Sequence, residues 1–145
     1  FISSTFWTER IGPTAALKTL EIMEQEKVWK DITNKGKYIQ ESWTQIAKKH
    51  DLDINVMGIP ALASFSINSK DFLKYKTYIT QQMLKEGYIA SNIVYSCTAH
   101  EQEIISEYLE LLDPIFKTIR ECEDGRKIDD LIDSPICHSG FARLN

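Results

Sequence analysis

Cysteine is scarce in this 145-residue sequence, and the cysteines present form no pattern. There are three, Cys97, Cys122 and Cys137. An odd number at wide spacing argues against a framework of disulfide bonds, which small secreted domains use to stabilise a limited core. The sequence therefore predicts a reducing environment, and we expect a cytoplasmic protein.

An excess of positive charge and long apolar runs are also missing. The 17 Lys and Arg face 21 Asp and Glu, a formal net charge of −4, so there is no electrostatic reason to expect binding to nucleic acid or an anionic membrane. No apolar stretch approaches the roughly 20 residues that span a bilayer. The opening residues, FISSTFWTER, lack the basic and apolar regions of a signal peptide. We expect neither nucleic acid nor a membrane as a partner.

Common motifs of catalysis and metal binding are absent as well. The sequence contains no glycine-rich phosphate loop and no G-x-S-x-G nucleophile motif. Cys137 and His138 are adjacent, but without a second pair at zinc spacing they do not predict a metal site. His50 follows two lysines at a predicted helix end, and His100 lies in the first turn of a predicted helix, so both are interpreted as structural. The residues alone assign no catalytic group and no metal ligand.

The spacing of apolar residues predicts four helices and a few strands, in a chain with 43% hydrophobic and 26% charged residues. Helical spacing follows Gly12-Pro13 and recurs at about 31–50 (where Gly36 lowers helix propensity and makes a break possible), 69–87 and 98–125, where Pro114 should introduce a kink. Thr98 to Glu101 fits a capping box at the start of the last helix. Alternating residues at 61–67 predict a strand, with shorter strands near 54–56 and 89–95. We expect an α+β fold, a small antiparallel or mixed sheet with helices packed on one face.

The N-terminal stretch suggests two further points. The chain begins without Met, on the β-prone residues Phe1 to Trp7, and such a segment normally pairs with something before it. We therefore expect the chain to be cut from a longer protein. Ser4 and Thr5, shortly before a helix start, offer hydroxyls and amides of the kind that bind phosphate. A strand end that caps a helix is the alternative interpretation.

Four segments carry a resemblance to a known family. STFWTERIGPTAA, at 4–16, resembles the Gly-Thr-Leu-Ser-Gly-Asn-Pro segment and the following alanine-rich helix of class III aminotransferases and glutamate-1-semialdehyde aminomutases, which use pyridoxal phosphate (PLP). GIPALASF at 58–65, MLKEGYIA at 83–90 and SCTAH at 96–100 are similar to later segments of that family, in the same order. The resemblance covers about residues 3–122. The tail CHSGFARL at 137–144 is similar to the end of aminomutase-like proteins linked to sugar biosynthesis.

The resemblance implies the C-terminal small domain of a fold type I PLP enzyme. Residues 13–145 would form this α+β domain, and residues 1–12 would be left over from the large PLP-binding domain. It further implies that Ser4 and Thr5 bind the PLP phosphate of the partner subunit in a homodimer. The lysine that holds PLP would lie outside the chain. The chain would then contribute to the active-site wall, the phosphate site and the dimer, and alone it would not catalyse.

The sequence also departs from the family. Trp7 to Arg10 replace the usual Ser-Gly-Asn-Pro, and residues 87–100 lack both the substrate-facing glutamate of the aminomutases and the arginine that ω-aminotransferases use for a substrate carboxylate. The polar side chains offered there before His100 are mainly hydroxyls and one amide, which predicts a small sugar-like or semialdehyde substrate, an amine or aldehyde rather than a dicarboxylate. The alternative is a free-standing α+β module for protein binding or dimerisation. A bare apolar surface would favour the enzyme part, and a polar surface the module.

Overall fold

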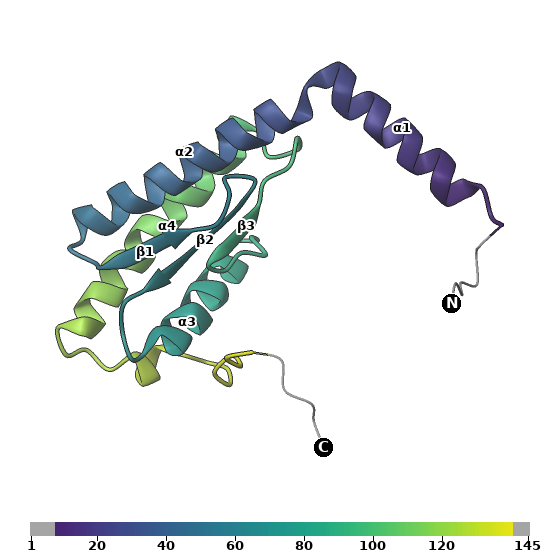
Figure 1. Cartoon of the computed structure of the whole chain (residues 1–145). Coiled ribbons are helices and arrows are strands. Elements are labelled where there is room, and N and C mark those ends of the chain that lie inside the picture. Colours follow the sequence, from purple (N-terminus) through teal and green to yellow (C-terminus); the bar gives the residue numbers. More distant parts are fainter. Residues whose placement is uncertain (1–7, 141–145) are drawn as a thin grey trace.

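The computed structural model describes residues 8–140, so Ser4 and Thr5 lie outside the described range. It confirms the predicted α+β class, because helices pack against a three-stranded sheet (Figure 1). The elements in chain order are α1 (Ile11–Glu26), α2 (Val28–Lys49), β1 (Ile54–Met57), β2 (Leu62–Ile67), α3 (Phe72–Lys85), β3 (Ile93–Tyr95), α4 (Gln102–Glu123) and the 3-10 helix η1 (Ile128–Leu131). None of the helices in residues 8–140 is long and apolar enough to cross a membrane.

The first helix begins two residues earlier than its sequence pattern suggested. The carboxylate of Glu9 accepts hydrogen bonds from the backbone N–H groups of Ile11 and Gly12, the latter at 3.1 Å. These are orphan amides of a helix N-terminus, so the carboxylate extends the helix to Ile11. Helix α1 therefore passes through the proposed boundary between residues 12 and 13, a boundary that stays a prediction.

A single residue, Lys27, separates α1 from α2. The sequence pattern placed the second helix from about residue 31, but the junction lies earlier, at Lys27, which adopts the left-handed conformation with φ 53° and ψ 40°. That conformation is unfavourable for a residue with a Cβ. An ion pair between Lys27 and Glu24 at 2.6 Å, and the Lys27 ammonium 5.2 Å from the ring centroid of Trp29, hold the joint. Helix α1 consequently leaves the body of the molecule at an angle (Figure 1).

Helix α2 runs unbroken for 22 residues and passes through Gly36, where the sequence allowed a break. Gly36 is buried, and the backbone of Pro60 lies directly against it: a Cβ added at Gly36 would lie 1.8 Å from the Pro60 carbonyl oxygen. The glycine is therefore a contact point between α2 and the loop joining β1 to β2. Its cost to helix propensity is offset by the close approach that it permits.

The sheet has the order β1-β2-β3 and is antiparallel throughout. Alternation along β2, predicted from the sequence, places Ala63, Phe65 and Ile67 on a buried face. Helices α2, α3 and α4 cover this one face, as predicted (Figure 1). The opposite face of the sheet carries the alternate residues.

Three aromatic rings join α2, β2 and α4 at the centre of the core. Phe65 of β2 stands edge-on to Trp43 of α2 and to Phe116 of α4, with ring centroids 4.9 and 5.5 Å apart. All three rings are fully buried. The indole N–H of Trp43 donates a 2.9 Å hydrogen bond to the hydroxyl of Tyr108, also in α4. The buried polar group of Trp43 is thereby satisfied.

The capping box predicted at Thr98 to Glu101 is wrong. Helix α4 begins at Gln102, its cap residue is Glu101, and no side-chain cap bond forms. The physical reason is tertiary: the carbonyl of Thr98 accepts a 3.0 Å hydrogen bond from the Lys35 ammonium, which holds residues 97–100 in a turn before the helix. Pro114 does lie within α4, as predicted, and the helix continues past it to Glu123.

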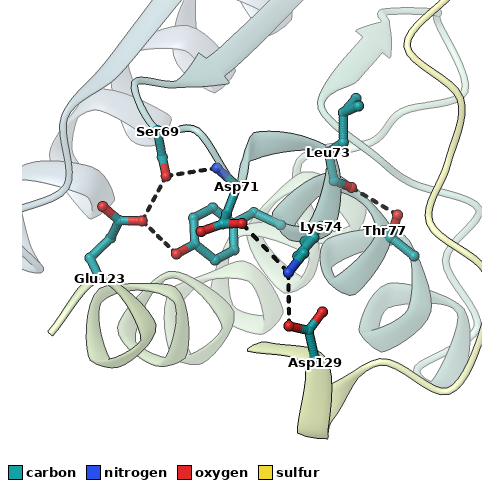
Figure 2. A network of polar contacts seen from close by, with 8 residues as sticks. Ser69, Asp71, Leu73, Lys74, Thr77, Glu123 and Asp129 are labelled. Carbon is teal, nitrogen blue, oxygen red and sulfur yellow. Dashed lines mark hydrogen bonds and ion pairs between the residues drawn. The ribbon is translucent and has the colours of Figure 1, made fainter. Parts of the chain in front are cut away.

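Polar contacts fasten α3 to the elements that follow it (Figure 2). The hydroxyls of Ser69 and Tyr75 both donate to the carboxylate of Glu123 at the end of α4, the former at 2.8 Å, and the Lys74 ammonium lies 2.8 Å from Asp129 of η1. Burial and the Glu123 carboxylate raise the pKa of Tyr75 above its usual range. The phenol therefore stays protonated and keeps donating.

Residues after η1 return along α3, and Cys137 contacts this helix. The backbone N–H of Cys137 donates to the Thr77 hydroxyl at 2.9 Å, and its thiol lies 3.5 Å from the carbonyl oxygen of Leu73. The side chain of Gln81 bridges to Leu131 and Asp133. Cys137 thus attaches the C-terminal segment to α3.

Asp113 ties α4 to the end of α2. Its carboxylate accepts a hydrogen bond from the Lys49 ammonium and pairs with the largely buried imidazole of His50. Burial acts to raise the pKa of Asp113, but hydrogen bonds and charges from Lys49 and His50 outweigh it, and the pKa is lowered from its usual 3.8. The structural role predicted for His50 is confirmed by this contact.

We expect Asp113→Asn to lower the free energy of unfolding near neutral pH and to flatten its acid dependence. A carboxyl group whose pKa is lower in the folded state stabilises the fold above the unfolded-state pKa, and this contribution disappears as the pH falls through the folded-state pKa. Denaturant titrations at neutral pH and from about pH 5 to pH 2 measure both effects. Glu110→Gln, on the exposed side of α4, is the control, and an Asp113→Asn profile that matches it would contradict the expectation.

Candidate functional site

The face of the sheet turned away from the helices carries four exposed apolar side chains beside the polar Asn55, Ser64 and Ser66. We call Met57, Leu62, Ile93 and Tyr95 the open sheet face; these side chains are between 40% and 71% exposed. The strand register aligns Met57 with Ser64 and Ser64 with Ile93 in one row, and Leu62 with Tyr95 in the next. Residues two apart in a strand point to the same side, so the four apolar side chains share one surface.

A groove of about 300 Å³ lies beside this face, between β3 and the first half of α4. Its lining is mostly apolar and includes Ile89, which is 98% exposed. His100 is the one imidazole among the lining residues, and it precedes α4 instead of lying in its first turn. An apolar groove with a few polar groups at its rim is the usual form of a binding site.

Two tyrosines that line the groove have their hydroxyl groups held in hydrogen bonds and stay uncharged near neutral pH. The Tyr88 hydroxyl donates a 2.8 Å hydrogen bond to the Glu107 carboxylate, and burial together with Glu107 raises the pKa of Tyr88. The Tyr108 hydroxyl accepts from Trp43, and burial raises the pKa of Tyr108 above its usual range. Neither phenol is therefore a proton acceptor near neutral pH, and both give the groove its shape.

The segment 87–100, expected to face a substrate, is partly engaged within the fold. Asn92 is buried, and its side-chain amide donates a 2.8 Å hydrogen bond to the Phe65 carbonyl. Ser96 is buried too, and its backbone N–H donates to Ala61. The Asn92 amide and the Tyr88 hydroxyl are thus held in hydrogen bonds within the fold, and the Ser96 hydroxyl is buried with no hydrogen-bond partner among the described residues. The reason for a sugar-like substrate is therefore weakened. Tyr95, Cys97 and Thr98 are the exposed polar side chains of the segment.

The described residues do not build a PLP site by themselves. The groove is lined by no lysine that could hold the cofactor and by no cation for its phosphate. Ser4 and Thr5, the predicted phosphate ligands, lie outside residues 8–140, so their role stays a prediction. Within the same residues, no group of three or more His, Cys, Asp and Glu side chains comes together that could hold a metal ion. The arrangement is suited to covering or binding an apolar surface.

Sequence reasoning found the segment 87–100 but missed the open sheet face. A signal was present in β3, because Ile93 and Tyr95 on one side and Val94 on the other make this strand apolar on both sides. A strand that is apolar on both sides is typical of a sheet covered on both faces.

Comparison with known proteins supports the resemblance. The chain is 23% identical over 117 residues to a 3-aminobutyryl-CoA aminotransferase of Cloacimonas acidaminovorans (strain Evry), a match covering 77% of this chain and 28% of the relative. It is 26% identical over 123 residues to a glutamate-1-semialdehyde 2,1-aminomutase of Sulfurihydrogenibium azorense, covering 75% of this chain and 29% of the relative. No model of a known protein family matches the chain.

The fold matches part of a PLP enzyme. A solved structure of the PLP internal aldimine form of the FumI protein of Sphingopyxis sp. MTA144 superposes with a TM-score of 0.74 at 18% identity, over 86% of this chain and 31% of that protein. The chain therefore spans less than a third of the length of the proteins it matches. It is distantly similar to class III aminotransferases, and its α+β fold is that of a portion of a fold type I PLP enzyme, as the sequence predicted.

Proposed function

We propose that this chain is the C-terminal part of a PLP-dependent aminotransferase or aminomutase and acts there as one wall of the active site. The open sheet face is the observation that carries the proposal. An independent module would present a polar surface, whereas Met57, Leu62, Ile93 and Tyr95 are exposed together on one side. Such a surface marks an interface. The distant similarity to class III aminotransferases supplies the kind of enzyme.

The chemistry would be divided between this chain and the rest of the enzyme. PLP, when bound, supplies an electron sink for transfer of an amino group. The residues of this chain would bind and enclose: Ser4 and Thr5 would hydrogen-bond the PLP phosphate of the partner subunit in a homodimer, and the groove beside β3 would exclude water from a small amine or aldehyde substrate. A large domain would provide the lysine.

The complete enzyme, and not residues 1–145 alone, should therefore carry the activity. We expect PLP and borohydride to label lysines of the isolated chain only in scattered, substoichiometric amounts. The complete subunit should bind PLP stoichiometrically and transfer an amino group in a screen of donors and acceptors. Stoichiometric labelling of one lysine in residues 1–145 would overturn the assignment of the lysine to another domain.

Thr5→Ala in the complete dimer is expected to weaken PLP binding about 10- to 100-fold, because a hydrogen bond to a charged phosphate contributes roughly 1.5–3 kcal/mol. The dissociation constant of PLP, measured by absorbance titration of the apoenzyme, is the readout. Thr14→Ala, an exposed residue of α1, is the matched control. An unchanged constant for Thr5→Ala would count against the proposed phosphate site.

A further inference from the structure

The groove beside β3 presents mainly carbon atoms to a ligand. Its exposed lining side chains are three isoleucines and one tyrosine: Ile89, Ile93, Tyr95 and Ile104. The hydroxyls of Tyr88 and Tyr108 are already hydrogen-bonded within the fold. A sugar hydroxyl placed here would lose its hydrogen bonds to water and gain few in return, whereas an apolar group would displace that water favourably. The lining therefore favours an apolar ligand over a hydroxyl-rich one.

The volume of the groove, about 300 Å³, limits the size of this ligand. A water molecule takes up about 30 Å³ of the liquid, so the groove holds roughly ten waters, or an alkyl or aromatic group with about as many carbon atoms. One turn of a helix with its side chains, about 5 Å long and 10 Å wide, already exceeds this volume. The groove is thus suited to part of a small molecule.

Charge around the groove selects among small molecules. Residues 86–110 include every lining residue except Ile39, and they contain five glutamates and no Lys or Arg. All five carboxylates are on exposed residues: Glu86, Glu101, Glu103, Glu107 and Glu110. His100 is the only lining residue that could carry a positive charge. This distribution attracts a cationic ligand and repels a carboxylate.

Two of these glutamates lie at the rim of the groove. The Glu107 carboxylate accepts the 2.8 Å hydrogen bond from Tyr88, a lining residue. Glu101 directly precedes α4, and its carbonyl accepts a 3.1 Å hydrogen bond from the backbone N–H of Ile105. Residues three and four apart share one side of a helix, so Glu101 lies beside Ile104 and Ile105 of the lining. An apolar hollow with carboxylates at its rim matches a molecule with an apolar tail and an ammonium group.

We infer that the groove beside β3 binds the apolar tail of the amino donor, and that this donor is a primary amine without a carboxylate. The inference rests on the proposed function and names its donor class. In the transfer, the carbon that bears the amino group is oxidised to an aldehyde, and the carbonyl carbon of the acceptor is reduced as it takes the amino group. The acidic rim raises the local concentration of the ammonium form, and the tail is held by the isoleucines.

Three ligands with the same chain and different head groups test the charge and the apolar contact together. Binding of n-hexylamine, 1-hexanol and hexanoate to the PLP-free complete subunit is measured by calorimetry at low and high salt. We expect n-hexylamine to bind most tightly and hexanoate about 10-fold more weakly, with the difference shrinking at high salt. With PLP bound, kcat/KM should rise about 2- to 4-fold per methylene from n-butylamine to n-octylamine, because each added methylene is buried.

Two substitutions assign these effects to the groove. Ile89→Lys places a cation in it, and Ile89 is 98% exposed in residues 8–140, so no packing is lost there. We expect this change to weaken n-hexylamine about 10-fold and to strengthen hexanoate. Glu101→Gln, which removes no side-chain cap bond, should reduce the preference for the amine about 3-fold. Glu41→Gln, an exposed residue of α2 outside the lining, is the control and should change neither ligand.

The other outcomes overturn the inference. Equal binding of the three ligands would show that the rim does not select charge, and an Ile89→Lys subunit that binds both ions as before would show that another part of the protein covers the groove. A subunit that binds PLP but uses glutamate in preference to n-octylamine overturns the inference alone. A subunit that binds no PLP overturns the proposed function.

Discussion

Replacing Gly36 by alanine is expected to destabilise the fold by about 3 kcal/mol, although the same change at most helix positions stabilises. The added Cβ would meet the Pro60 carbonyl oxygen at 1.8 Å. Backbone cannot rotate away as a side chain can, so α2 and the loop between β1 and β2 would have to separate. Urea denaturation followed by circular dichroism measures the loss.

Gly12→Ala is the matched control, because Gly12 is also a helix residue and its added Cβ would lie 3.8 Å from the nearest atom, a Glu9 carboxylate oxygen. We expect Gly12→Ala to be neutral or to stabilise by up to about 1 kcal/mol. If the two substitutions shift the urea midpoint equally, the close approach of α2 to Pro60 is wrong.

Phe65→Ala should have a comparable or larger effect, a loss of about 3–5 kcal/mol in the free energy of unfolding. Phe65 is fully buried and touches the rings of Trp43 and Phe116, so its removal leaves a cavity where α2, β2 and α4 meet. A loss of this size is a large fraction of the stability of an average domain. Thermal and urea unfolding of the purified variant give the value.

Phe72→Ala provides the comparison, because Phe72 is only partly buried at the edge of the same core. Its loss should be clearly smaller than that of Phe65→Ala. Equal losses for the two phenylalanines would mean that the core is not centred on the three rings.

The features that could be predicted from the sequence are those with a local cause. The alternation from Ala61 to Ile67 predicts a strand with one buried face because side chains of a strand alternate by geometry, and β2 follows it. Helical spacing likewise predicted the four α-helices, since apolar residues that share one side of a helix recur every three or four positions in the sequence.

The errors have causes that lie far away in the chain. Gly36 was interpreted as a place where the helix could break, because its partner, Pro60, is not visible in the local pattern. Thr98 was interpreted as a cap, but Lys35, 63 residues earlier, holds its carbonyl. The candidate site could be predicted only in part. The resemblance indicated Ser4 and Thr5, which stay predictions. The groove beside β3 depends on how α4 packs, so it could not be predicted from the spacing of residues in the sequence.

The joint at Lys27 has a consequence for how order spreads along the chain. Helix formation propagates from residue to residue because each hydrogen bond fixes the start of the next, and a left-handed residue interrupts that succession. Helix α2 is anchored by Trp43 and Ile39 in the core, yet its order cannot extend through Lys27 into α1. The two helices therefore melt as separate units, and α1 can lose its helical form in a subunit whose core is still intact.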